Sequence, residues 1–185
     1  MNIVIISGSP RQQSVTHRIA LHLEQQIKAT TEHQVSVIDV RDWDLGFLQN
    51  VFQTVESTPE KFKPLAAQMF AADGFILVTP EYNGSYAPAL QNLLDHFPKQ
   101  LHKPFGIVTG STGGFGGIRA SQDLFLLIAG LFGIASPQKL LVPFMDKKFD
   151  AQGNLIDEAF ANSVHSFIKS YLWLAERLVH EHANA

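Results

Sequence analysis

The stretch VIISGSPRQQSVTHRIALHL (residues 4–23) contains the change of pattern that decides the fold. An apolar run typical of a buried strand ends at Ser7, and from Val15 to Ile27 apolar residues recur at every fourth position, as on one face of a helix. Between them lie one glycine, several hydroxyl side chains and an arginine. The pattern predicts a strand that passes through a short loop into a helix packed on a sheet.

The same alternation continues along the chain. Apolar or β-branched runs predict strands at residues 2–7, 34–40, 75–79, 105–109 and 137–142. Helical periodicity and proline placement predict helices at residues 14–28, 64–72, 88–97, 118–132 and 157–180. Because parallel strands need helical crossovers, we expect an α/β fold: a flavodoxin-like three-layer sandwich whose five-stranded parallel sheet, in order 2-1-3-4-5, carries helices on both faces. No linker divides the chain, so one domain is expected over residues 1–185.

Composition and charge exclude several classes of protein. The net charge of −3 and the absence of a basic run give no reason to expect nucleic acid as a partner. The longest apolar run, residues 124–131, is far shorter than the roughly 20 residues of a membrane span. The chain has no cysteine, which excludes disulfides and fits a cytoplasmic protein, and its eight histidines show no metal-ligand spacing. We therefore expect no membrane, no nucleic acid and no metal.

Unusual loops follow three of the predicted strands. They are SGSPRQQS (residues 7–14), PEYNGSY (residues 80–86) and GSTGGFGG (residues 110–117). Parallel strands point the same way, so their carboxyl ends, and these loops, must meet at one edge of the sheet. This edge, where the strand order reverses, is the expected ligand site.

The first loop has the groups that bind a phosphate. Ser9, Ser14 and Thr16 supply hydroxyls, the helix N-terminus supplies free amides, and Arg11 adds a full positive charge. Alternatively, Ser14 is only an N-cap and Arg11 only a solvated surface residue. Neither G-x-x-x-x-G-K nor G-x-G-x-x-G is present, which favours a mononucleotide over a pyrophosphate. Asp39 could imitate the ribose-binding acid of a dinucleotide fold, but an ordinary strand-end residue is the simpler interpretation.

The other two loops suit a flat ligand. A proline and an Asn-Gly turn hold residues 80–86 in a defined bend that can direct backbone groups at a ring edge, as flavin requires. Five glycines within residues 110–117 allow the backbone to approach such a ring closely, unless they serve only the shape of the loop.

Together these motifs resemble a known family. GSPRQQS, PEYNGSYAPALQNLLD and GSTGGFGGIRA, in this order, are similar to the NAD(P)H-dependent FMN reductases, which include quinone, azo-dye and chromate reductases. The resemblance covers most of the chain, and PEYN is its most specific part. It implies FMN as cofactor and NAD(P)H as co-substrate.

The resemblance also implies the residues that contact FMN. The phosphate would be held by Ser9, Arg11, Ser14, Val15 and Thr16; the isoalloxazine would be lined by Pro80, Glu81, Tyr82 and Asn83 and approached by Ser111, Gly113 and Gly114. Because the flavin carries the chemistry, no catalytic side chain is expected. In particular, Glu81 is expected to contribute its backbone rather than act as a general base.

The expected function is an oxidoreductase that passes hydride from NAD(P)H to bound FMN and then electrons to a small acceptor. Quinones, azo compounds and metal oxyanions are candidate acceptors, and use of one open flavin face would give ping-pong kinetics. A flavodoxin-type electron carrier without NAD(P)H oxidation is the alternative, although such carriers usually display a strongly acidic face. A non-redox nucleotide-binding module is a third possibility.

An apolar helix and an irregular segment bear on assembly. LFLLIAGLF (residues 124–132) is apolar on nearly every side, so its second face is covered either by a partner subunit or by the last helix. The family resemblance implies a homodimer or homotetramer, with an interface near residues 88–97 and 118–132. The segment DWDLGFLQNVFQTV (residues 42–55) either walls the substrate pocket or packs against its own domain.

Overall fold

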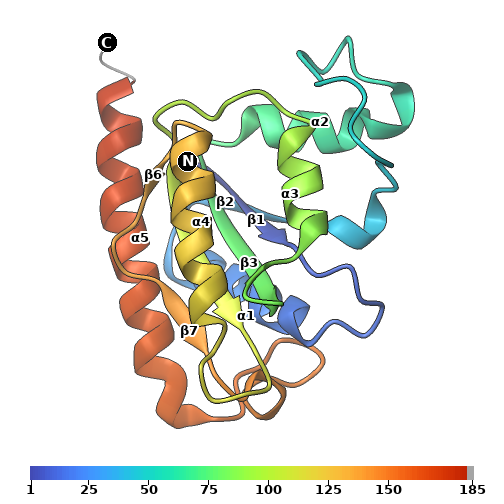
Figure 1. Cartoon of the computed structure of the whole chain (residues 1–185). Helices are drawn as coiled ribbons and strands as arrows, with labels where there is room; N and C mark the ends of the chain where they lie inside the picture. The colour runs from blue at the N-terminus through green and yellow to red at the C-terminus, as the bar shows by residue number, and fades with distance from the viewer. Residues whose placement is uncertain (183–185) are drawn as a thin grey trace.

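The chain forms a twisted sheet with helices on both faces (Figure 1). The computed structural model describes residues 1–182. Its strands are β1 (Asn2–Ser7), β2 (Gln34–Asp39), β3 (Gly74–Tyr82), β4 (Ser85–Tyr86), β5 (Pro104–Gly110), β6 (Ile134–Ala135) and β7 (Leu140–Val142). The main helices are α1 (Val15–Thr30), α2 (Lys63–Ala71), α3 (Pro88–Asp95), α4 (Ile118–Gly130) and α5 (Ala161–His182).

The strand order confirms the predicted topology. Parallel pairing gives the order β2-β1-β3-β5-β6, and β7 also pairs with β5. The predicted fifth strand, residues 137–142, is correct only at its end, as β7, and β6 was not predicted. The two pieces are separated where the Ser136 amide still donates to the Phe105 carbonyl at 2.7 Å but Pro137 has no amide to continue the ladder. The flavodoxin-like order 2-1-3-4-5 is therefore present, with a broken edge strand.

Side chains alternate across the sheet and divide the core into two layers. In β1, Val4 and Ile6 pack with α2, α3 and α4, whereas Ile3 and Ile5 pack with α1 and α5. This follows from the two-residue period of a strand, and both faces are apolar because helices cover both. The layering places the carboxyl ends of β1, β3 and β5 at one open edge.

The structure bears on the two segments for which the sequence left alternatives open, residues 42–55 and the apolar helix around residues 124–132. Within residues 42–55, Phe52 is buried and its ring centroid lies 5.5 Å from that of Phe97, so this part packs against its own domain. In α4, Leu124 and Ile128 are buried against the sheet, but Leu126 is 74% exposed. The last helix therefore does not cover this residue. Across residues 1–182, none of the helices combines the length and hydropathy that a bilayer span requires.

Candidate functional site

Direct contacts bring the predicted loops together at the carboxyl edge of the sheet. The Gly8 amide donates to the Val78 carbonyl of β3 at 2.8 Å, which fixes the start of the first loop against the neighbouring strand. The guanidinium carbon of Arg11 lies 4.8 Å from the ring centroid of Tyr82 in the second loop. Glu81 of the second loop pairs with Arg119 at the start of α4, where the third loop ends. The three loops thus form one continuous surface.

The first loop ends in a capped helix N-terminus with free donors. The Ser14 hydroxyl accepts a hydrogen bond from the His17 amide at 3.2 Å, so Ser14 is the N-cap of α1. Among the described residues, the amides of Val15 and Thr16 have no acceptor. Such amides, with an exposed Arg11 nearby, are the usual components of a phosphate site. Ser14 can therefore be the N-cap of a helix that also binds an anion, because the cap leaves the amides of Val15 and Thr16 unused.

The hydroxyl of Thr16 is buried against Met145. Thr16 is 1% exposed, and its Oγ1 lies 3.7 Å from the sulfur of Met145. Its amide is therefore the group available to an anion. Ser9, which follows Gly8, is also buried, at 2% exposure. A Cβ on Gly8 would lie 2.9 Å from the Leu90 Cβ of α3, so only glycine allows this close approach.

The second loop is a tight β-hairpin. Asn83 and Gly84 both have positive φ, 52° and 90°, and they join β3 to the antiparallel β4. Asn-Gly is the preferred pair for such a turn because both positions tolerate a left-handed backbone. The Thr79 hydroxyl accepts from the Ala87 amide at 3.0 Å and donates to the Pro80 carbonyl at 3.1 Å. These bonds hold the bend that the sequence predicted.

Tyr82 has a buried hydroxyl that lacks a hydrogen-bond partner among the described residues. The core residue Tyr171 carries another such hydroxyl, so the missing partner does not by itself indicate a function, but it leaves the Tyr82 hydroxyl available to a ligand. The Arg11 guanidinium covers the same ring, so Tyr82 of the predicted isoalloxazine loop is in contact with the predicted phosphate loop. The orphaned donor and the free helix amides fit a ligand such as FMN, which carries both a phosphate and hydrogen-bonding groups.

Glu81 uses its carboxylate to hold the start of α4. The carboxylate accepts from the Arg119 amide at 3.1 Å and the Ala120 amide at 3.4 Å, and it pairs with the Arg119 guanidinium at 2.6 Å. Negative charge at a helix N-terminus is stabilising. The carboxylate is thereby committed to a structural contact, which agrees with the expectation that Glu81 is not a general base. Sequence reasoning missed Arg119, although it belongs to the quoted GSTGGFGGIRA motif.

The glycines of the third loop divide into two groups. Gly116 and Gly117 have φ values of 60° and 79°, and a Cβ on Gly116 would lie 2.9 Å from backbone atoms of Val142, so these two shape the loop. A Cβ on Gly113, by contrast, would meet no atom closer than the Ser111 Oγ at 3.9 Å. Gly116 and Gly117 thus serve the shape of the loop, whereas Gly113 and Gly114 are exposed, and their approach to a flat ligand stays a prediction.

A fourth segment, which sequence reasoning missed, joins this edge. Residues 143–147 follow β7, and the Phe144 amide donates to the Gly113 carbonyl at 3.2 Å. The Met145 amide donates to the Ser111 carbonyl at 3.1 Å, and the Phe144 side chain is 48% exposed. The signal was present in the topology, because the carboxyl end of the last strand must lie at the same edge as the other loops.

Asp39 is not free to bind a ribose. Its buried carboxylate pairs with the Arg41 guanidinium, and its Oδ2 lies 3.1 Å from Nδ1 of His17. Although burial alone would raise the pKa of Asp39, hydrogen bonds from Arg41 and the charge of nearby groups hold it below its ordinary value. The carboxylate is thus ionised and already paired, which argues against the dinucleotide interpretation.

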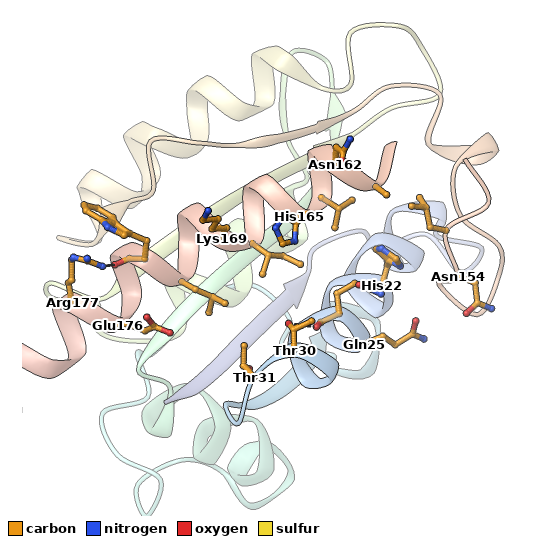
Figure 2. A pocket seen from close by; sticks show the side chains of 17 residues that line it. His22, Gln25, Thr30, Thr31, Asn154, Asn162, His165, Lys169, Glu176 and Arg177 are labelled. Atoms are coloured by element: carbon orange, nitrogen blue, oxygen red, sulfur yellow. Dashed lines mark hydrogen bonds between the residues drawn. The ribbon is translucent and has the colours of Figure 1, made fainter. Parts of the chain in front are cut away.

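A groove of about 840 Å³ lies elsewhere on the molecule, between α1 and α5. Figure 2 shows that its walls carry His22, Gln25 and Thr30 from α1 and His165, Lys169 and Glu176 from α5. None of its lining residues belongs to the three predicted loops. The candidate flavin site is therefore the loop-bearing edge and not this groove.

Comparison with known proteins identifies relatives along the whole chain. A family profile described as NADPH-dependent FMN reductase matches residues 1–145. The FMN-dependent NADPH-azoreductase of Staphylococcus aureus is 28% identical over 188 residues, which cover 98% of this chain and 99% of that protein.

Solved structures with the same fold include an oxidoreductase and a flavodoxin. The flavoenzyme NAD(P)H:(acceptor) oxidoreductase FerB from Paracoccus denitrificans superposes with a TM-score of 0.79 at 20% identity, covering 95% of this chain and 97% of that one. A flavodoxin mutant from Pseudomonas aeruginosa gives a TM-score of 0.56 at 17% identity, covering 92% and 99%. Both likenesses concern the fold, which is flavodoxin-like.

Proposed function

Because the chain belongs to the NADPH-dependent FMN reductase family, with FMN as cofactor and NAD(P)H as co-substrate, we propose that it is an NAD(P)H-dependent FMN oxidoreductase acting on small electron acceptors. The observation that carries the proposal is the convergence of Arg11 and Tyr82, from two different loops, beside the free N-terminal amides of α1. When bound, FMN accepts hydride from NAD(P)H and passes electrons onward. The protein binds and orients it.

We propose that the first loop binds the phosphate and that the second and third loops line the ring. Arg11 and the amides of Val15 and Thr16 offer positive charge and free donors to the phosphate, with Ser9 and Ser14 in the same loop. For the ring, we propose Pro80, Glu81, Tyr82 and Asn83 from the hairpin and Ser111, Gly113 and Gly114 from the glycine-rich loop. The open space around Gly113 supports the second assignment.

The acceptor is proposed to be an azo compound, a quinone or a metal oxyanion. An azo compound has additional support, because the Staphylococcus aureus relative is an azoreductase and its similarity to this chain extends over nearly the full length of both proteins. Residues 112–115 are exposed, which would give NAD(P)H and the acceptor access to one face in turn. Initial rates at varied concentrations of NADPH and acceptor should give parallel double-reciprocal lines. Intersecting lines would contradict a ping-pong order.

A direct experiment separates this proposal from its alternatives. The purified protein, reconstituted with FMN, should be yellow, and its flavin absorbance should bleach on anaerobic addition of NADPH or NADH. A yellow protein that does not bleach would be a flavodoxin-type carrier. A protein that stays colourless after addition of FMN would exclude both flavin functions and leave the nucleotide-binding module.

We also propose that the protein is a homodimer or homotetramer through α3 and α4. Exposed apolar side chains along the α4 region support this: Phe115, Leu126 and Phe132 are 82%, 74% and 60% exposed. Phe47, which is 92% exposed, is available to wall a pocket of a neighbouring subunit. Light scattering on the eluted protein should report twice or four times the chain mass, and a monomer would refute the proposal. A cytoplasmic location stays a prediction.

A further inference from the structure

Asp39, at the end of β2, is the centre of a hydrogen-bond network beside the first loop. Its carboxylate accepts from the Arg41 amide at 3.0 Å and from Arg41 Nε at 2.9 Å, in addition to the contact with Nη2. On the other side, His17 Nδ1 lies 3.1 Å from the Asp39 carboxylate and 3.0 Å from the Ser7 hydroxyl. The network joins the ends of β1 and β2 to the first turn of α1.

Arg41 extends this network into the predicted phosphate loop. Its Nη1 donates to the Gln12 carbonyl at 2.7 Å. Residues 10–13 are exposed, and among the described residues no side chain other than Arg41 donates to their backbone carbonyls. Gln12 lies between Arg11 and the helix cap Ser14. The position of Gln12 therefore affects the positions of Arg11 and Ser14.

The ionisation states of Asp39, Arg41 and His17 favour a fixed arrangement of their side chains. Asp39 is buried at 7% exposure, yet its pairing with Arg41 keeps it ionised. Burial lowers the pKa of His17 despite the attraction of Asp39, so the imidazole is neutral at pH 7. The guanidinium is planar and binds the carboxylate through two nitrogens while a third reaches Gln12. A lysine has no such fork and could not make these contacts together.

We propose that Arg41, held by Asp39, is a positioning residue for FMN binding: it fixes the Gln12 carbonyl and thereby keeps residues 8–14 in the conformation that grips the phosphate. This inference rests on the proposed FMN-dependent function. It adds Arg41, which would act on FMN binding indirectly, through residues 8–14. It predicts that the network matters for flavins that carry a phosphate and not for riboflavin, which lacks one.

The test compares FMN with riboflavin on cofactor-free protein. Quenching of flavin fluorescence would give both dissociation constants for the parent, Arg41→Ala, Arg41→Lys and a control, Arg18→Ala. Arg18 is matched because it also donates to one backbone carbonyl, that of Phe149 at 3.0 Å, outside the network. Arg41→Ala should weaken FMN binding about tenfold or more, as expected for loss of a charged hydrogen bond, and leave riboflavin within about twofold. Arg41→Lys should resemble Arg41→Ala, and Arg18→Ala should resemble the parent.

Each contrary outcome has a distinct meaning. Equal weakening of FMN and riboflavin binding by Arg41→Ala would overturn the proposal, because it would indicate a general defect of the fold. Full FMN affinity in Arg41→Lys would overturn it as well, because charge alone would then suffice. A parent protein that binds neither flavin would refute the proposed function itself.

A second measurement needs no cofactor. Hydrogen exchange of the backbone amides of residues 8–14 should be faster in Arg41→Ala than in the parent and unchanged in Arg18→Ala. If Arg41→Ala fails to fold, Asp39→Asn provides the same comparison, because it keeps the side-chain shape and removes the charge that holds Arg41. If Arg41→Ala or Asp39→Asn folds and the amides of residues 8–14 exchange at the parent rate, the proposal that Arg41 holds this loop would be refuted.

Discussion

The guanidinium of Arg11 lies over the ring of Tyr82, with 4.8 Å between its central carbon and the ring centroid. Arg11 lies in the loop that follows β1, and Tyr82 is the last residue of β3, the neighbouring strand of the sheet. A cation over an aromatic face is attracted by the ring, so the contact holds an otherwise exposed arginine near the free amides of α1. This relationship joins the predicted phosphate site to the predicted ring site.

Replacing Arg11 should weaken FMN binding and leave the fold intact. Arg11 is exposed, so Arg11→Ala should change the free energy of unfolding by no more than about 0.5 kcal/mol. Loss of a charged donor to phosphate is expected to raise the FMN dissociation constant about tenfold or more. Titration calorimetry and thermal unfolding on the same preparations would check both. Equal FMN dissociation constants for variant and parent would remove Arg11 from the site.

Replacing Tyr82 by phenylalanine should have opposite effects on folding and binding. The Tyr82 hydroxyl is buried without a partner among the described residues, so Tyr82→Phe should leave the cofactor-free protein equally stable or more stable, by up to about 1 kcal/mol. FMN affinity should fall, because the hydroxyl is proposed to serve the ligand. Urea unfolding without flavin and FMN titration are the two measurements. A clear loss of stability with unchanged affinity would contradict the assignment.

Glu81 should matter for stability more than Arg119, its partner. Glu81→Ala removes the carboxylate that caps α4 and should cost about 1 kcal/mol of unfolding free energy, as for other lost caps. The Arg119 side chain is 75% exposed, so Arg119→Ala should cost less, about 0.5 kcal/mol or below. Urea unfolding would compare them. If Glu81 is not a general base, as expected from the sequence, the pH profile of the proposed NADPH oxidation should be the same for Glu81→Gln and the parent.

Stability should fall as the solution becomes acidic, in part through His17. Burial lowers the pKa of His17 in the folded chain, so the unfolded chain binds more protons near and below pH 6.5, and stability is lost as the pH falls through this range. The lowered pKa of Asp39 adds a further loss below about pH 3.8. Urea unfolding between pH 7.5 and 5.0 would measure the first effect.

His17→Asn provides the control for that pH dependence. Removal of the imidazole should make the decline between pH 7.5 and 5.0 shallower than in the parent. Some decline should remain, because burial also lowers the pKa of His22, although its Nδ1 donates to the Gly153 carbonyl at 2.9 Å. Parallel pH curves for His17→Asn and the parent would show that His17 does not titrate on unfolding.

Much of the architecture could be read from local pattern. Apolar periodicity located every main helix and every parallel strand except β6 within a few residues, because a strand or helix must bury its apolar face at its own repeat. The positive φ values at Asn83 and Gly84 agree with the Asn-Gly turn, since few other residues tolerate this backbone. Placement of the three loops at one edge followed from the direction of parallel strands. These features depend on neighbours in sequence or on topology.

The partners of individual side chains depended on packing between distant segments. Only the folded chain places Asp39 between Arg41 and His17, commits the Glu81 carboxylate to Arg119, and turns the Thr16 hydroxyl toward Met145. A side chain with several possible partners in sequence takes the one that the tertiary fold brings within hydrogen-bond distance. Residue types thus limited the chemistry available at this edge, and the three-dimensional packing decided which groups remain free to hold a ligand.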